Sequence, residues 1–189
     1  MAKEKLVLAS KNKGKIREFT EIFNNYEIIP YTDLGIDVDP DETGETFFDN
    51  ALIKAKTISQ ICNLPVLADD SGLCVDALGG APGVYSARFS GLGDDENNKK
   101  VLALLEGETN RKANFTCALV LYKPDGTVIG VEGKTYGTIL HQVQGNNGFG
   151  YDVIFYSEDI NKCFGLATPE EKNEVSHRAR AIKKIKQYL

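Results

Sequence analysis

The first thirty residues alternate between short apolar runs and a helical repeat, and this pattern constrains the fold most. Residues 5–10 form an apolar run that ends in polar residues, as in a buried strand. Ile16, Phe19 and Phe23 then recur at helical spacing, and residues 27–31 look like a second strand. A strand, a loop, a helix and another strand in this order predict an α/β layer fold.

The rest of the chain continues this mixture of helices and strands. Thr168, Pro169 and Glu171 form a capping box with proline at the first helical position, so a helix begins there. No internal repeat or linker interrupts the pattern, so we expect one domain over residues 1–189. The other expected elements are a helix over 47–62, a short strand over 65–68, a helix from Asp94, as its cap, to about Leu105, a hairpin of 113–123 and 127–137, and a strand over 153–156.

Composition excludes several classes of protein. Hydrophobic residues make up 42% and charged residues 26% of the 189 residues, as in ordinary globular proteins. The net charge of −5 argues against a nucleic-acid-binding protein, which would carry a basic excess. No apolar run approaches the ~20 residues that span a bilayer, and no signal-peptide core follows Met1, so we expect a cytoplasmic protein without a membrane partner. Four scattered cysteines and two histidines argue against a zinc site.

A basic loop follows the first predicted strand and opens a helix. Free backbone N–H groups and the helix dipole favour an anion at such a position, and lysines add positive charge. The loop is no Walker P-loop, because the G-x-x-x-x-G-K-[ST] pattern is absent. A solvated basic turn is the alternative. The candidate phosphate ligands are Ser10, Lys11, Asn12, Lys13, Gly14 and Lys15.

Acidic residues stand at the end of the short strand predicted over residues 65–68. Asp69 and Asp70 are followed by Ser71 and a glycine, at a sheet edge where α/β folds place ligands. Magnesium prefers carboxylate oxygens and phosphates, and a nearby carboxylate can orient or deprotonate water. The alternative is a turn chosen only for its backbone hydrogen bonds.

A second acidic segment precedes the helix over residues 47–62. Glu45 is best interpreted as a helix-capping feature. Glu42 lies further out in the loop, and we favour it as the second acidic metal ligand. Lys54 lies two turns into the helix, where a purely structural lysine would simply be exposed.

Two later segments could bind the remainder of a nucleotide. Glycines flank Phe149 in the run Gly148, Phe149, Gly150, Tyr151 and Asp152, so the backbone can approach a flat ligand and the ring can stack on a base. The alternative is a tight turn with a buried phenylalanine. Near the C-terminus, Lys172, His177 and Arg178 cannot share one face of a continuous helix, so we predict a break at Ser176. A solvated basic helix is the alternative there.

Taken together, these segments resemble the inosine/xanthosine triphosphate pyrophosphatase family, also called the Ham1-like family. They occur in the family's order over nearly the whole chain, and seven of them in order are far more specific than any one. Lys11 and Lys13 stand at variable positions, and Val153 replaces a proline often found there. The matching segments are Ser10 to Lys15, Glu42 to Gly44, Asn50–Ala51 with Lys54–Ala55, Ala68 to Leu73, Gly79 to Arg88, Gly148 to Asp152, and Glu171–Lys172 with Ser176 to Arg178.

The resemblance implies a two-lobed α/β fold around a long mixed sheet, an active site in the central cleft, and a homodimer. It implies Asp70 as proton acceptor and Mg²⁺ ligand, with Glu42 also on the metal. The loop from Ser10 to Lys15 and Ser71 would bind the triphosphate. The base and the rest of the nucleotide would be held by Phe149, Gly150, Tyr151, Asp152, Lys172, His177 and Arg178.

The expected reaction cleaves aberrant purine triphosphates (ITP, dITP, XTP) to the monophosphate and pyrophosphate, which cleanses the nucleotide pool. Lys13, Lys15 and Lys54 would neutralise the polyphosphate, with Asp69 as a possible supporting acid. One alternative is a non-catalytic nucleotide-binding module, which leaves the acidic residues without a role. Another is a pyrophosphatase for modified pyrimidine nucleotides.

Overall fold

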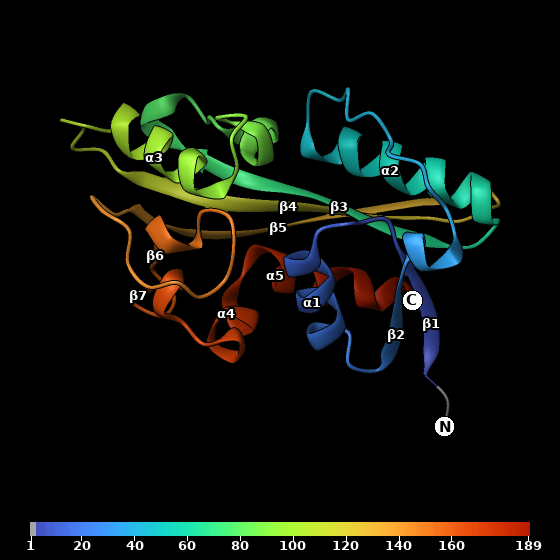
Figure 1. The fold of residues 1–189 in the computed structure, drawn as a ribbon. Coiled ribbons are helices and arrows are strands. Elements are labelled where there is room, and N and C mark those ends of the chain that lie inside the picture. Colours follow the sequence, from blue (N-terminus) through green and yellow to red (C-terminus); the bar gives the residue numbers. More distant parts are fainter. Residues whose placement is uncertain (1–2) are drawn as a thin grey trace. The chain divides into compact units, whose positions relative to one another are not determined.

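The computed structural model describes residues 3–189 and divides them into two compact units. The first unit contains the residues up to Asp70, Cys117–Gly133 and Arg180–Leu189, and the second contains Ser71–Thr116 and Lys134–Ala179. Three strands and the last helix therefore contribute residues to both units. Figure 1 shows the order of the elements along the chain.

The strands form one mixed sheet of seven strands, in the order β2-β1-β3-β4-β5-β6-β7. β1 pairs in parallel with β2 and β3, whereas β6 pairs antiparallel with β5 and β7. The predicted α/β fold with a mixed sheet and flanking helices is confirmed. The strands are β1 (Glu4–Leu8), β2 (Tyr26–Pro30), β3 (Val66–Val75), β4 (Lys112–Tyr122), β5 (Val128–Ile139), β6 (Phe155–Ser157) and β7 (Lys162–Cys163).

In the first unit, two helices cover opposite faces of β3. Phe19 of α1 (Lys13–Ile22) belongs to the same buried cluster as Leu67. Ala55 of α2 (Phe47–Cys62) packs instead in a cluster with Val66 and Ala68. Because successive side chains of a strand point to opposite faces, Leu67 and Asp69 face α1, whereas Val66, Ala68 and Asp70 face α2.

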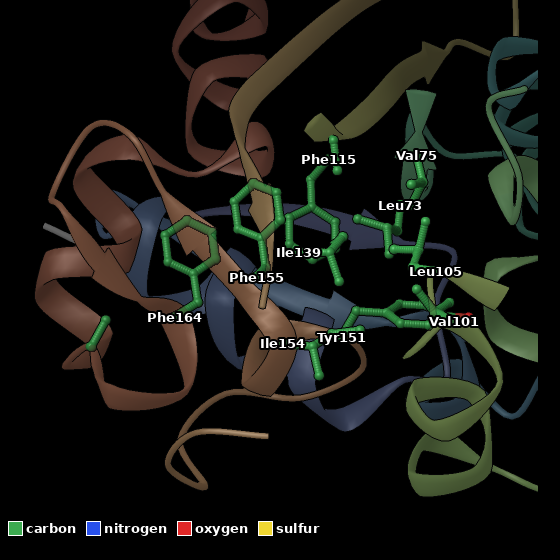
Figure 2. Close-up of a cluster of buried hydrophobic side chains, with 12 residues drawn as sticks. Leu73, Val75, Val101, Leu105, Phe115, Ile139, Tyr151, Ile154, Phe155 and Phe164 are labelled. Carbon is green, nitrogen blue, oxygen red and sulfur yellow. The ribbon is translucent and has the colours of Figure 1, made fainter. Parts of the chain in front are cut away.

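The second unit has its own aromatic core (Figure 2). The Phe115 ring lies 4.5 Å from the Phe155 ring and 6.2 Å from the Phe164 ring, measured between centroids. Leu73 and Val101 belong to the same cluster. The helices here are α3 (Asp94–Leu104), α4 (Pro169–Val175) and the start of α5 (His177–Ile185).

Two local predictions are wrong and one is confirmed. The strand predicted over residues 65–68 does not end at Asp69 but continues to Val75, because Leu73 and Val75 are buried core residues whose backbone stays extended. Asp94 does not cap its helix, because Gly93 is the N-cap residue and Asp94 begins the first turn. The predicted break at Ser176 is confirmed, since α4 ends at Val175 and α5 begins at His177.

The boundaries of the other predicted elements, including the strand predicted over 153–156, agree with the structure to within two residues. That strand begins at Phe155, because Asp152–Ile154 form a short 3-10 turn. The helix over 47–62 has the predicted bounds. Across residues 3–189, every helix is too short or too polar to cross a membrane.

Candidate functional site

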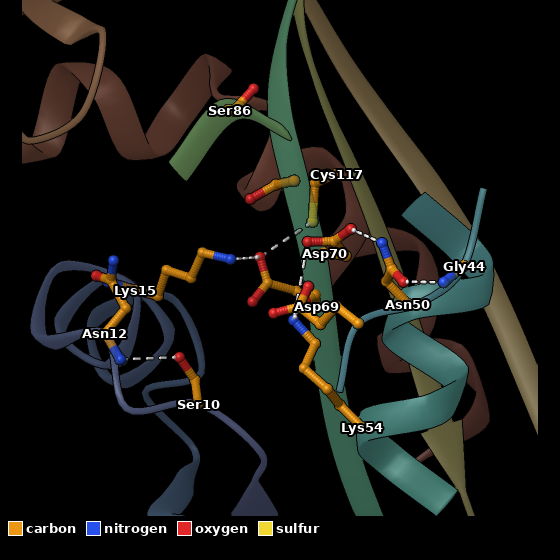
Figure 3. A network of polar contacts seen from close by, with 12 residues as sticks. Ser10, Asn12, Lys15, Gly44, Asn50, Lys54, Asp69, Asp70, Ser86 and Cys117 are labelled. Atoms are coloured by element: carbon orange, nitrogen blue, oxygen red, sulfur yellow. Dashed lines mark hydrogen bonds and ion pairs between the residues drawn. The ribbon is translucent and has the colours of Figure 1, made fainter. Parts of the chain in front are cut away.

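Asp69 and Asp70 are adjacent in sequence, but they point to opposite faces of β3. Asp69 faces α1, where its Oδ2 lies 3.2 Å from Lys15 Nζ and 3.9 Å from Cys117 Sγ. Asp70 faces α2, where its Oδ2 accepts a hydrogen bond from Asn50 Nδ2 at 3.2 Å. Both carboxylates are buried in the middle of a strand. The two acids therefore serve different partners (Figure 3).

Lys54 is the centre of what we name the acid–lysine cluster, consisting of Lys15, Glu42, Asn50, Lys54, Asp69 and Asp70. The Lys54 ammonium lies 3.5 Å from Glu42 Oε2 and 3.8 Å from Asp70 Oδ1. It also donates a hydrogen bond to the Asp69 backbone carbonyl at 2.6 Å. Glu42, from the loop before α2, and Asp70, from β3, thus converge on one positive charge, that of the Lys54 ammonium.

The Asp70 carboxyl has an unusual proton affinity. Burial raises its pKa from 3.8 to about 6, and the negative charge of Glu42 acts in the same direction. The positive charges of Lys54 and Lys15 oppose this rise, as does the Asn50 hydrogen bond. A carboxylate with a pKa nearer neutrality is a stronger proton acceptor than an ordinary aspartate.

The predicted phosphate loop is built as a capped helix start. Asn12 is the N-cap of α1, and its Oδ1 accepts a hydrogen bond from Lys15 N at 3.0 Å. Ser10 Oγ accepts one from Asn12 N at 3.2 Å. The backbone amides of Lys13 and Gly14 lie in the first turn of α1, where N–H groups lack helical acceptors.

The three lysines of this loop have different surroundings. Lys15 is anchored by Asp69, and this ion pair ties the first turn of α1 to β3. Lys11 points toward Tyr31, whose hydrogen bond raises the pKa of the lysine, and its Nζ lies 3.9 Å from Asp39. Lys13 is exposed. Lys15 therefore lies in the acid–lysine cluster, whereas Lys11 is held outside it.

In the second unit, four predicted residues form what we name the aromatic–cation cluster: Phe149, Asp152, Lys172 and Arg178. Lys172 Nζ lies 2.5 Å from Asp152 Oδ2, and both side chains are buried. The same ammonium lies 4.6 Å from the centre of the Phe149 ring, and the Arg178 guanidinium lies 5.8 Å from it. The structure therefore brings together residues up to 29 positions apart, and their contacts with a nucleotide stay a prediction.

Glycines around Phe149 allow a tight loop. Asp152 Oδ2 accepts a hydrogen bond from Phe149 N at 3.0 Å, and a Cβ on Gly148 would lie only 2.0 Å from that oxygen. Both Gly148 and Gly150 have positive φ angles, which glycine adopts readily. The phenylalanine is held in this turn and only partly buried, in contrast to the alternative of a fully buried core residue.

Three further predicted ligands, Tyr151, His177 and Ser71, have structural partners of their own. Tyr151 is part of the aromatic core, its hydroxyl donates to the Ser86 carbonyl at 2.6 Å, and burial raises its pKa. The His177 ring stacks on Phe115 at 4.9 Å. Arg178 Nη2 donates to Ser71 Oγ at 2.9 Å. Their contacts with a substrate stay predictions.

Sequence reasoning missed the contacts by which several residues hold these clusters together. Asn50 occurs one turn before Lys54 on the same helical face, and a polar residue next to the apolar stripe of α2 was the available signal. In the second unit, Asp94 Oδ2 accepts from Gly150 N at 3.0 Å, and Asn98 Nδ2 donates to Gly150 O at 2.9 Å. The four-residue spacing of Asp94 and Asn98 was the signal there.

Glu42 and Asp70 are the residues that could hold a metal. No group of three or more His, Cys, Asp or Glu side chains that could hold a metal occurs within residues 3–189. Magnesium, however, is bound in many enzymes by one or two carboxylates, with substrate phosphates and water completing its shell. Two carboxylates that converge on one cationic nitrogen fit that donor set.

Comparisons with known proteins relate the whole chain to one family. The sequence model of the Ham1 family matches residues 6–188. A Staphylococcus epidermidis protein named dITP/XTP pyrophosphatase is 43% identical over 188 residues, covering 98% of this chain and 96% of the relative. A Bacillus anthracis protein of the same name is 46% identical over 194 residues, covering 98% and 96%.

Solved structures extend this likeness to the fold. The structure of the Staphylococcus aureus Ham1 protein matches with a TM-score of 0.88 at 40% identity, and the match covers 98% of this chain and 97% of that chain. The family model, the relatives and the structure all cover nearly the full length of the sequence. This chain belongs to the Ham1 family.

Proposed function

We propose that this chain hydrolyses the aberrant purine triphosphates ITP, dITP and XTP to the monophosphate and pyrophosphate. The relatives named dITP/XTP pyrophosphatase, at 43% and 46% identity over almost the full length, support the substrate class. The observation that carries the chemistry is the convergence of Glu42 and Asp70 on the Lys54 ammonium. Such a site removes deaminated purines from the nucleotide pool.

Asp70 acts as the proton acceptor. A water oxygen attacks the α-phosphorus, the water proton passes to the Asp70 carboxylate, and the bond between Pα and its bridging oxygen breaks. The bridging oxygen keeps the bonding electrons and leaves with pyrophosphate. The raised pKa of Asp70, about 6, suits this role because proton transfer is most efficient when the base has a pKa near the working pH.

Lysines and Mg²⁺ counter the charge of the triphosphate. Lys15 and Lys54 lie beside the buried acids and can turn toward phosphate oxygens, with Asp69 holding Lys15 and the amides of the loop from Ser10 to Lys15 adding donors. Glu42 and Asp70 would hold the metal. Bound magnesium supplies positive charge that stabilises the oxygens of the α-phosphate and of the leaving group.

The aromatic–cation cluster recognises the base. Phe149 offers a ring for stacking, and Lys172, His177 and Arg178 are candidate donors to the 6-oxo group of inosine or xanthosine. Adenine presents a donor at that position, which would leave buried donors unpaired at a cost of ~1–3 kcal/mol each. ATP should therefore be a poor substrate. The homodimer implied by the resemblance and the cytoplasmic location expected from the composition stay predictions.

A triphosphate panel tests the proposal. ITP, dITP, XTP, ATP, GTP and a modified pyrimidine triphosphate would be incubated with the protein and magnesium, and pyrophosphate and orthophosphate would be measured separately. We expect pyrophosphate from the first three. Release of orthophosphate would refute attack at the α-phosphorus, binding without turnover would favour a nucleotide-binding module, and turnover of the pyrimidine alone would favour the other class of pyrophosphatase.

A further inference from the structure

Asn50 lies between the two acids of the proposed active site and bonds to both segments that carry them. It is buried in the second turn of α2. Its side-chain carbonyl accepts a hydrogen bond from Gly44 N at 2.7 Å, in the loop that carries Glu42. Its amide nitrogen donates to Asp70 Oδ2 at 3.2 Å. Figure 3 shows this chain of contacts from Gly44 through Asn50 to Asp70.

The contact at Gly44 is close enough to require glycine. A Cβ at this position would lie 2.7 Å from Asn50 Oδ1 and 2.5 Å from Asp49 Cβ, and real Cβ atoms essentially never approach other atoms so closely. The loop backbone therefore packs directly on the start of α2. Since Glu42 is only two residues away, the Gly44 contact limits where that carboxylate can lie.

The two ends of the Asn50 side chain have different and fixed tasks. One end must accept from a backbone N–H, and the other must donate to a carboxylate. Of the side chains with this size and shape, only asparagine does both, because aspartate has no donor when ionised and leucine has neither group. A buried side chain that satisfies both partners holds them in one arrangement.

We infer that Asn50 is a positioning residue for the hydrolytic reaction. It holds the Asp70 carboxylate and the Glu42 loop in fixed positions relative to each other. Its bond fixes Asp70 Oδ2, so that Oδ1, which lies on the side of Lys54, faces the proposed reaction centre. This inference rests on the proposed function. It adds a residue that touches neither the substrate nor the metal but sets the geometry of the groups that do.

Two substitutions separate the two bonds of Asn50. Asn50→Asp keeps the shape of the side chain and the acceptor for Gly44 N, but it removes the donor to Asp70 and places a second carboxylate there. Asn50→Ala removes both bonds. Ser59→Ala is the matched control, because Ser59 is equally buried on the same helix and its hydroxyl donates at 2.6 Å to Leu64 O, away from the cluster.

The experiment measures kcat and KM for ITP, and hydrogen exchange of the Gly44 amide by NMR in the protein without metal or nucleotide. For Asn50→Asp we expect kcat to fall about 10- to 100-fold, the usual effect of losing an outer-shell partner, while Gly44 exchange stays as slow as in the wild type. For Asn50→Ala we expect a similar fall in kcat and faster Gly44 exchange. Ser59→Ala should keep kcat within about twofold, as expected of a site outside the reaction.

Three outcomes would overturn the inference. The first is an Asn50→Asp protein with more than half the wild-type kcat, and the second is an equal loss of kcat in Ser59→Ala, which would indicate general damage to α2. The third is unchanged Gly44 exchange in Asn50→Ala. A wild-type protein that releases no pyrophosphate from any triphosphate would instead refute the proposed function, so the two failures are distinguishable.

Discussion

The two clusters differ in how tightly their charges are held. In the acid–lysine cluster the ion pairs are 3.2 to 3.8 Å long. The side chains of Lys15, Lys54 and Glu42 are 16%, 13% and 32% exposed, although those of Asp69 and Asp70 are only 0% and 9% exposed. In the aromatic–cation cluster the Lys172–Asp152 pair is 2.5 Å long, and its side chains are 6% and 3% exposed. Long, partly hydrated pairs can exchange partners with a ligand, whereas a short, buried pair is part of the scaffold.

This difference assigns separate tasks to the two clusters. The acid–lysine cluster has charges that a metal and a polyphosphate can recruit, so it suits chemistry. The aromatic–cation cluster uses its charges to fix the Phe149 loop, so it suits recognition of shape. Substitutions in the first should therefore change turnover with little cost in stability, and substitutions in the second should do the reverse.

Asp70→Asn should have the largest effect. Asparagine cannot accept the water proton, so we expect kcat for ITP to fall about 10²- to 10⁴-fold, the range for loss of a general base. Nucleotide binding should persist, because the lysines remain. Single-turnover kinetics and calorimetric titration with ITP measure the two quantities. Near-normal turnover would remove Asp70 from its role and with it the contrast between the clusters.

Asp152→Asn tests the scaffold in the second unit. It removes the carboxylate charge that lies against the buried Lys172 ammonium, so the free energy of unfolding should fall by about 3 kcal/mol. Glu42→Gln removes the partly exposed ion pair with Lys54, which is 3.5 Å long. This change should lower the free energy of unfolding by less than about 1 kcal/mol. Urea denaturation of both variants gives the comparison. If both variants lost the same free energy of unfolding, the exposure and length of an ion pair would not distinguish the two clusters.

Part of this contrast was predictable from sequence and part was not. Helical spacing gave the bounds of α2, and the incompatible directions of Lys172 and His177 predicted the break at Ser176, because both depend on local geometry. The segment of Asp69 and Asp70 resembles a turn in composition but lies within a strand. Its extended form depends on long-range sheet pairing and on burial, which residue types alone do not reveal.

The roles of the site residues were likewise predictable from sequence only in part. Residue chemistry was enough to nominate Glu42, Lys54 and Asp70, because charged groups in unusual positions stand out. The opposite directions of Asp69 and Asp70 follow from strand alternation, and so became visible only once the strand was known to continue. Asn50 has no charge to mark it, and its importance lies in two contacts with distant segments.

The pH dependence of the free energy of unfolding shows what the ionised Asp70 carboxylate costs the folded protein, separately from its proposed role in catalysis. Its pKa is raised by burial to about 6 from an ordinary 3.8, so the folded protein binds the proton more tightly than the unfolded chain. The resulting stability is fully present below about pH 3.8 and is lost as the pH rises through about 6.

Asp70→Asn should therefore gain stability relative to the wild type between pH 4 and pH 7, by up to about 2 kcal/mol. Denaturation with urea at several pH values without metal checks this. A constant difference across the range would contradict the raised pKa. The expected result is a variant that is more stable and nearly inactive. This is the pattern of a charged group that serves catalysis although it destabilises the fold.

Asn98→Ala should have the smallest effect and should appear in recognition rather than in turnover. The side chain of Asn98 donates to the Gly150 carbonyl at 2.9 Å, next to Phe149, so its loss should loosen the loop that presents the ring. One hydrogen bond contributes about 1 kcal/mol, which predicts a rise in KM for ITP of about fivefold and a weaker preference for ITP over ATP, with kcat nearly unchanged. Lys99→Ala is the matched control, because Lys99 is the next residue on α3 and its ammonium lies 2.6 Å from the partly exposed Glu96. A fall in kcat without a change in preference would place the α3 contacts in the chemistry and would break the division of tasks between the two clusters.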